Sequence, residues 1–282
     1  MTGLVLEGGG MRGMFTMGIV DLLCEQRVKV DGIVGVSAGA CFGCNYKSHQ
    51  PGRALRYNAR FMGDPRYMSV RGLLRTGNLF DAEFCYHTVP REFDVFDTAT
   101  FEQDPTEFHL VCTDAVTGEA VYKQLTHVDY DALEWIRATS SMPLVSQPIP
   151  LEGRLLLDGG MVDSIPLRHA QELGFDRNIV VLTQPRGFRK KPSRIVPLFR
   201  LFMRKYPKVA EVMERRHEMY NAQLDYLYSQ EASGKVLLIF PDEPLCISRI
   251  EKKPAELHRV YQLGRTKGKE CLEQIQTFIA TK

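Results

Sequence analysis

Two segments of the chain contain glycines where a reaction could need them. The first is LVLEGGGMRG, residues 4–13, in which glycines directly follow a short apolar run. A glycine-rich turn that opens a helix presents peptide N–H groups and the positive end of the helix dipole, so it can bind negative charge. Two anions fit such a loop: the pyrophosphate of a dinucleotide, or the oxyanion that forms when a nucleophile attacks a carbonyl group.

The second segment is GVSAG, which ends an apolar run and begins a stretch of small residues. This G-x-S-x-G pattern is typical of a nucleophile elbow, a tight strand-to-helix turn that exposes a serine hydroxyl. Side chains at the two glycine positions would crowd the turn, and the helix that follows would stabilise an anion. An ordinary turn is the alternative, but the context on both sides favours the elbow. The motif comprises Gly35, Val36, Ser37, Ala38 and Gly39.

A candidate base lies in DGG, where Asp158 precedes Gly159 and Gly160 after the apolar run RLLL. Asp-Gly is a very common turn dipeptide, so the motif alone says little. Its position after a predicted strand is more informative. We expect the Asp158 carboxylate to emerge at the same strand-end edge of the sheet as Ser37.

The dinucleotide alternative can be tested against the sequence. Gly8, Gly10 and Gly13 fit G-x-G-x-x-G, which requires an acidic residue about 20 positions later, at the end of the second strand. Asp31 is near that distance, but it begins the run GIVGV instead of ending it. The far end of that strand holds Ser37. The glycine loop and the elbow would then be neighbours, an arrangement that favours an oxyanion over a cofactor.

Predicted strands and helices alternate through the first 185 residues, which indicates an α/β fold. We predict a three-layer α/β/α arrangement in which helices cover both faces of a mostly parallel central sheet. The expected strands are 4–7, 30–36, 154–157 and 178–185, with a hairpin around Thr117 and Gly118; the expected helices are 12–26, 38–47, 52–62, 129–140 and 166–173.

The composition changes after Pro185. Residues 186–208 contain nine Lys or Arg and no acid, interleaved with large apolar residues. A helix over 209–229, the strand KVLLIFP and a helix from about Pro254 should follow. We therefore expect a catalytic core over 1–185 and an extension over 186–282 that completes or caps it. Within the extension, 186–208 either contacts an anionic membrane surface or packs on the core with its charges solvated.

Taken in order, GGGMRG, GVSAG and DGG resemble the three motifs of the patatin-like phospholipases. DGIVGVSAGA, CTDAVTG, ATSSMPLVSQPI and DGGMVDSIPL are also similar to segments of that family, and the resemblance covers about residues 3–185. One departure is Ser164, since many members have Asn at that point before the proline.

The resemblance implies a serine lipid acyl hydrolase of the phospholipase A or lysophospholipase type, which uses a Ser–Asp dyad and no metal or cofactor. Ser37 would be the nucleophile and Asp158 the base. The backbone of Gly9 and Gly10, together with Gly8, would form the oxyanion hole. Residues with a supporting role in these motifs would be Met11, Arg12, Gly13, Gly35, Val36, Ala38, Gly39, Gly159 and Gly160.

The sequence leaves alternatives open for the catalytic residues, for the role of Arg12 and for the function of the protein. A Ser–His–Asp triad would add His169, His217 or His258 to the two dyad residues. Arg12 would either brace the glycine loop by pairing with a carboxylate or contact a substrate phosphate. As a whole, the protein could instead be a dinucleotide-binding oxidoreductase or a catalytically silent lipid-binding protein.

Composition and charge argue against a nucleic-acid-binding, membrane-spanning or disulfide-rich protein. The net charge of +2 gives no reason to expect nucleic acid as a partner, and no apolar run is long enough to span a membrane. Seven cysteines do not indicate a disulfide framework, and the start of the chain lacks the pattern of a signal peptide, so we expect reduced thiols and a cytoplasmic location. Cys41 and Cys44 have a redox-like spacing, but packing behind the elbow is the simpler interpretation.

Overall fold

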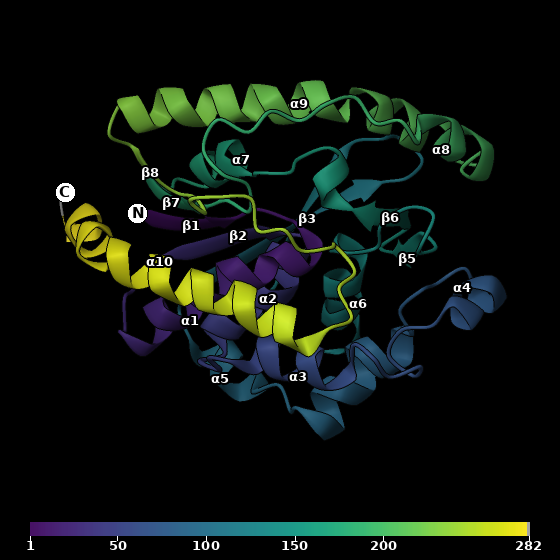
Figure 1. The fold of residues 1–282 in the computed structure, drawn as a ribbon, viewed down its shortest axis with the longest axis horizontal. Helices are drawn as coiled ribbons and strands as arrows, with labels where there is room; N and C mark the ends of the chain where they lie inside the picture. Colours follow the sequence, from purple (N-terminus) through teal and green to yellow (C-terminus); the bar gives the residue numbers. More distant parts are fainter. Residues whose placement is uncertain (281–282) are drawn as a thin grey trace.

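One mixed β-sheet with helices on both faces organises the chain (Figure 1). The computed structural model describes residues 1–280. The strand order is β5-β6-β3-β2-β1-β7-β8, and β4 pairs with β3 outside this path. The strands are β1 Thr2–Leu6, β2 Gly32–Val36, β3 Glu107–Asp114, β4 Ala120–Gln124, β5 Ile149–Leu151, β6 Arg154–Asp158, β7 Arg177–Val181 and β8 Val236–Ile239.

The helices form the two outer layers. α7 and α9 cover one face of the sheet, and α1, α2, α3 and α10 lie on the other (Figure 1). The α-helices are α1 Gly13–Glu25, α2 Ala38–Lys47, α3 Arg53–Phe61, α4 Val70–Thr76, α5 Thr98–Gln103, α6 Tyr130–Thr139, α7 Leu167–Glu172, α8 Val196–Phe202, α9 Pro207–Ala232 and α10 Pro254–Ala280. Two 3₁₀ turns, η1 Gly10–Arg12 and η3 Gly159–Met161, and a π-helix, η2 Phe84–Phe93, complete the elements.

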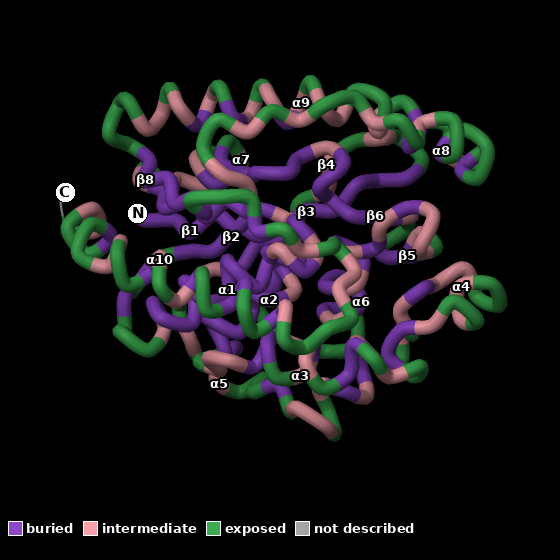
Figure 2. The backbone as a smooth tube through the Cα atoms, in the orientation of Figure 1, coloured by how far each residue is buried: buried purple, intermediate pink, exposed green. Residues whose placement is uncertain are grey.

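The central strands are buried on both faces, which explains why their sequences are continuously apolar. Every residue of β1 and β2 is buried, as Figure 2 shows along the middle of the sheet. Alternate side chains face opposite layers: Leu4, Leu6 and Ile33 pack with α1 and α2, whereas Val5 and Val34 pack with α7 and α9. The predicted three-layer α/β/α fold is therefore confirmed.

Strand direction divides the sheet into two parts. β1 pairs in parallel with β2 and β7, as do β2 with β3 and β7 with β8. The pairs β3–β4, β3–β6 and β5–β6 are antiparallel. Four of these seven pairs are thus parallel, and the antiparallel ones lie at the end of the sheet that includes Asp158.

The C-terminal third contributes to the same sheet and core. β8 extends the sheet beside β7, and α10 packs along α1. The two helices approach most closely at glycines, because a Cβ atom on Gly264 would overlap the carbonyl oxygen of Phe15 and lie 3.1 Å from the Cα of Gly18. The hydroxyl of Tyr261 donates a hydrogen bond of 2.8 Å to buried Asp21. The division of the chain at residue 185 stays a prediction.

We predict that Gly264→Ala destabilises the protein because the added methyl group has no space between α10 and α1. The free energy of unfolding should fall by about 2 kcal/mol, the usual cost of overpacking, despite the better helix propensity of alanine. Urea denaturation measures this change. Gly63→Ala is the matched control, since nothing lies within 4 Å of a Cβ atom there. Equal stability of both variants would contradict the close packing of α10 on α1.

Candidate active site

Ser37 occupies the tight turn between β2 and α2, where its backbone is strained. Its φ of 56° lies in the left-handed region, which non-glycine residues rarely adopt and which costs on the order of 1–3 kcal/mol. The flanking glycines allow this turn: a Cβ atom on Gly35 would lie 2.8 Å from the backbone of Ala40, and one on Gly39 would overlap the carbonyl oxygen of Leu6. The strand–turn–helix context that the sequence predicts is present.

Hydrogen bonds fix both the side chain and the backbone of Ser37. Its hydroxyl donates to Oδ2 of Asp158 over 2.6 Å, and its backbone N–H donates to the hydroxyl oxygen of Thr139 over 3.0 Å. The Thr139 hydroxyl in turn donates to the carbonyl oxygen of Val111 in β3. The serine is therefore fixed relative to the sheet, with its hydroxyl aimed at a carboxylate.

Asp158 lies at the end of β6, which pairs antiparallel with β3. β4 occupies one edge of β3 over residues 109–113, so β6 must pair with the other edge, beyond the end of β2. Val36 is opposite Val111, and Asp158 is opposite the next residue, Cys112. β2 and β6 thus run toward each other along one edge of β3 and meet at their carboxyl ends. The geometry agrees with the expectation that both residues lie close together at strand ends, an expectation that did not specify the direction of β6.

The turn after Asp158 holds its carboxylate in place. Its Oδ1 accepts a hydrogen bond of 2.8 Å from the N–H of Gly160, and its own N–H donates to the carbonyl oxygen of Ser141 over 2.9 Å. Gly159 passes so close to β3 that a Cβ atom would overlap the carbonyl oxygen of Val111. The close approach of Gly159 to β3 and the hydrogen bond from Gly160 therefore explain the two glycines of DGG.

Burial makes Asp158 a stronger base than an ordinary aspartate. Desolvation raises the pKa of its carboxyl group, and the hydrogen bonds from Ser37 and Gly160 and the positive charges of Arg216 and Arg249 only partly oppose that effect. A raised pKa is what proton transfer from a serine hydroxyl requires near neutral pH.

The glycine loop lies beside these two residues. Gly8, Gly9 and Gly10 line a cavity of about 30 Å³ together with Ser37 and Asp158. Within residues 1–280, the N–H groups of these three glycines donate to no protein acceptor, so they are free to bind a ligand oxygen. The loop has no room for side chains: a Cβ atom on Gly8 would lie 2.9 Å from that of Ser37, and Gly10 has a φ of 59°.

The residues after the loop anchor it. The N–H of Met11 donates to the carbonyl oxygen of Arg249 over 3.2 Å, and a Cβ atom on Gly13 would lie 3.0 Å from that of Ala38. One of the two expectations for Arg12, that it braces the glycine loop by pairing with a carboxylate, was wrong. Its buried Nε has no partner, and its side chain forms no ion pair among the described residues.

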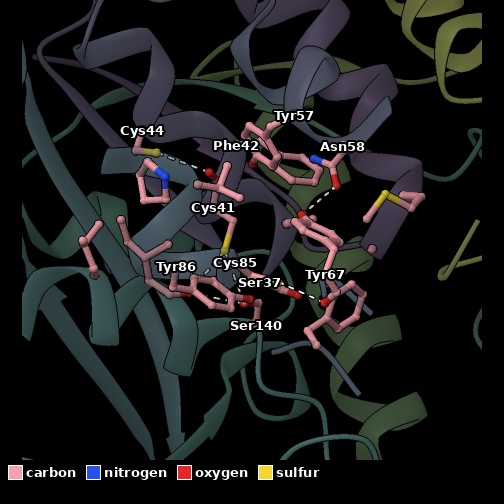
Figure 3. Close-up of a pocket in the computed structure, with 18 of the residues that line it drawn as sticks. Ser37, Cys41, Phe42, Cys44, Tyr57, Asn58, Tyr67, Cys85, Tyr86 and Ser140 are labelled. Atoms are coloured by element: carbon pink, nitrogen blue, oxygen red, sulfur yellow. Dashed lines mark hydrogen bonds between the residues drawn. The ribbon is translucent and has the colours of Figure 1, made fainter. Parts of the chain in front are cut away.

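An apolar cavity of about 130 Å³ extends from Ser37 between α2, α3, η2 and α6 (Figure 3). Its walls are mostly aromatic and aliphatic, and they suit a hydrocarbon chain. The wall residues labelled in Figure 3 are Cys41, Phe42, Cys44, Tyr57, Asn58, Tyr67, Cys85, Tyr86 and Ser140. Burial raises the pKa of Cys41 to about 12 and that of Cys44 to about 11, so both thiols stay protonated and serve as packing groups.

The three candidate histidines lie apart from the serine. The ring of His169 stacks on Tyr122 with a centroid distance of 3.7 Å, in a different cavity. His217 shares a cavity with Asp158, but its Nδ1 contacts the carbonyl oxygen of Glu214. His258 is exposed on α10. Throughout residues 1–280, no histidine forms a hydrogen bond with Ser37 or Asp158.

The site offers no acidic residue for the ribose of a dinucleotide and no cluster of metal-ligating side chains among the described residues. The Asp31 carboxylate accepts a hydrogen bond of 2.6 Å from the N–H of Thr2, and Asp31 precedes β2, at the end of the strand opposite Ser37. An acid there cannot reach a ribose bound at the glycine loop. In the described part of the chain, no group of three or more His, Cys, Asp or Glu is placed to hold a metal ion.

Comparison with known proteins gives two family matches. The model of the patatin-like phospholipases matches residues 4–170, and a model of a domain of unknown function matches residues 206–280. The uncharacterized protein YjjU of Escherichia coli is 26% identical over 99% of this chain and 79% of its own length.

Two further relatives share only part of their length with this chain. The uncharacterized NTE family protein Rv1063c of Mycobacterium tuberculosis is 30% identical over 68% of this chain and 51% of its own. Lysophospholipase nte1 of Emericella nidulans is 31% identical over 62% of this chain and 11% of its own.

The raised pKa of Asp158 predicts a stability gain on removal of its charge. Stabilisation by the neutral carboxyl group is fully present below the unfolded pKa, about 3.9, and is lost as the pH rises through the higher folded pKa. Asp158→Asn should therefore raise the free energy of unfolding at pH 7 by on the order of 1 kcal/mol, with little gain at about pH 3. Urea denaturation at the two pH values measures the difference.

Asp225→Asn is the matched control, because its exposed carboxylate pairs with Arg189 and has a lowered pKa. This variant should gain no stability at pH 7. A loss of stability at pH 7 in Asp158→Asn would contradict the view that burial dominates at Asp158.

Proposed function

Because the chain belongs to the patatin-like phospholipase family, we propose that it is a serine lipid acyl hydrolase that cleaves carboxylic esters through an acyl-serine intermediate. The observation that carries the proposal is the 2.6 Å hydrogen bond from the Ser37 hydroxyl to Asp158, beside the unpaired amides of the glycine loop. These groups are a nucleophile, a base and a set of oxyanion donors.

In the proposed mechanism, Asp158 accepts the proton of the Ser37 hydroxyl as its oxygen attacks the ester carbonyl carbon. The N–H groups of Gly9 and Gly10, with that of Gly8, stabilise the oxyanion, and each such donor is worth on the order of 3 kcal/mol. The intermediate collapses, and Asp158 returns the proton to the departing alcohol. Water then attacks the acyl-serine by the same steps and releases the fatty acid and free Ser37.

The apolar cavity supports a substrate with a long acyl chain. It opens at Ser37 and places aromatic side chains along the path that a chain would take from the ester group. The name of the relative nte1, a lysophospholipase, is in line with this class of substrate. We therefore propose phospholipase A or lysophospholipase activity.

We predict that Ser37→Ala abolishes covalent labelling by a fluorophosphonate probe, since the probe reacts with an activated serine hydroxyl. Asp158→Asn should lower kcat on a soluble acyl ester by roughly 10³-fold or more, because no base remains to accept the proton. Mass spectrometry of the labelled peptide and steady-state kinetics measure the two effects.

His169→Ala is the control for the dyad and should retain most of the activity. A loss in this variant as severe as that in Asp158→Asn would show that a histidine is required. If the wild-type protein is not labelled at Ser37, the protein is a silent member of the family.

We further propose that the protein meets its lipid at an anionic membrane surface. In residues 1–280, no helix combines the length and the apolarity needed to cross a bilayer. α8 instead exposes Leu198, Leu201 and Phe202, the last with 68% of its surface accessible, next to Arg204 and Lys205. Exposed apolar side chains flanked by cations are typical of interfacial helices. Arg200, by contrast, pairs with Glu214 over 2.7 Å and is less available to a headgroup.

The double variant Arg204→Ser and Lys205→Ser should bind vesicles that contain anionic phospholipid about thirtyfold more weakly, at roughly 1 kcal/mol for each of the two charges. Sedimentation with the vesicles measures binding, and the rate on a water-soluble ester provides the reference. Arg215→Ser, which removes an exposed cation paired with Glu218 on α9, is the control. Equal vesicle binding by the wild type and the double variant would exclude α8 as the contact.

A further inference from the structure

Four cationic side chains gather around the proposed dyad from parts of the chain that are far apart. Arg12, Arg216 and Arg249 line the small cavity that also contains Ser37 and Asp158. Lys190, Arg216 and Arg249, with Lys191 next in the chain, line a larger cavity of about 440 Å³ that also includes Asp158, and we call it the basic cavity. We call Arg12, Lys190, Arg216 and Arg249 the cation cluster.

None of these four cations forms an ion pair with a carboxylate among the described residues, although many other arginines and lysines of the chain do. The side chains of Arg12, Lys190 and Arg249 also form no hydrogen bond within residues 1–280, although the Nζ of Lys190 lies 4.2 Å from the ring centroid of Tyr220. The buried Nε of Arg12 lacks any partner. An unpartnered buried donor is costly, which indicates that a ligand completes Arg12. Arg216 and Lys190 are half-buried, and Arg249 is exposed.

The two nearby carboxylates are already engaged. Glu7 accepts hydrogen bonds from the Thr183 backbone, the Thr183 hydroxyl and the Tyr220 hydroxyl, and Asp158 accepts from Ser37 and Gly160. Four cations therefore face two occupied carboxylates. The resulting excess of positive charge favours the binding of an anion at this place.

Burial, together with repulsion between the cations, lowers the pKa of two members of the cluster. Burial, followed by repulsion from Arg216 and Arg249, lowers the pKa of Lys190 to about 7. Burial also lowers the pKa of Arg216, and Arg249 adds to that effect. A bound anion would relieve this repulsion.

Contacts with the rest of the protein position these side chains and leave donors available. The backbone of Lys190 exchanges two hydrogen bonds with the side chain of Asn221, at 2.9 and 3.0 Å. Arg216 donates to the carbonyl oxygen of Gly160 and to the Ser164 hydroxyl, which leaves its remaining Nη1 free. Arg249 lines the apolar, small and basic cavities, so it lies where an ester bound at Ser37 would continue into its polar part.

We propose that the cation cluster is a headgroup subsite that binds the phosphate monoester of an acylglycerol phosphate while its acyl chain occupies the apolar cavity. The inference deepens the proposed function and depends on it for the position of the ester. A dianionic phosphate satisfies several cations at once through charge-assisted hydrogen bonds. A choline headgroup would gain less, since Asp158 is the one acid among the described residues that line the basic cavity.

Binding to the Ser37→Ala protein tests the subsite without requiring catalysis. Isothermal titration with 1-acylglycerol 3-phosphate and with uncharged 1-acylglycerol of the same chain length, both below their micelle concentrations, should give a Kd at least about tenfold lower for the phosphate. Adding Arg249→Gln, or Lys190→Gln as a second variant, should reduce this preference about tenfold. The control Arg189→Gln, which removes the neighbouring exposed cation paired with Asp225, should preserve it.

Three outcomes would overturn the proposal: equal Kd values for the two lipids, a preference that survives both cation substitutions, or inorganic phosphate that binds as tightly as the lipid phosphate. The last would identify a site for free phosphate. A charge-dependent preference in Ser37→Ala, combined with a wild-type protein that cleaves neither lipid, would support the subsite and reject the hydrolase.

Discussion

The site depends on one constraint of the sheet: β2 and β6 share a single edge of β3 and stop where they meet. β4 fills the opposite edge, so no other place is available to β6. The carboxyl ends of two oppositely directed strands are thereby held one residue apart along β3, and each ends in a glycine turn. Ser37 and Asp158 face each other because β2 ends opposite Val111 and β6 ends opposite the next residue of β3, Cys112. The glycine loop after β1 then closes the third side.

Several features of the site lower the free energy of unfolding of the protein. Ser37 has a strained backbone, Asp158 is buried with a raised pKa, and the buried Nε of Arg12 has no partner among the described residues. Each feature costs stability, and a large core must offset them. The C-terminal third contributes to that core through β8 and α10, and it also supplies Lys190, Arg216 and Arg249 to the site. Residues outside the match to the phospholipase model therefore surround the polar side of the dyad.

Local patterns explain which parts of the structure could be predicted. The glycine loop, the elbow and the strand before Asp158 are read from contiguous residues, and the alternation of strands and helices predicts the layers. The direction of β6 depends on pairing with β3, more than 40 positions earlier, so no local pattern reports it. α4, α5 and η2 were not predicted, because residues 70–103 lack a clear apolar period and η2 contains Pro90. Arg249 lies in a loop without any motif, and only the structure brings its side chain to the site.

The most direct test of the central claim is a crystal structure of the protein after reaction with a fluorophosphonate. Such an adduct resembles the tetrahedral intermediate, so its oxygen reports where an oxyanion would bind. We predict a covalent bond to the Ser37 oxygen, with a phosphonyl oxygen about 2.7–3.1 Å from the N–H nitrogens of Gly9 and Gly10. An adduct whose phosphonyl oxygen faces solvent, or one formed at a different side chain, would contradict it.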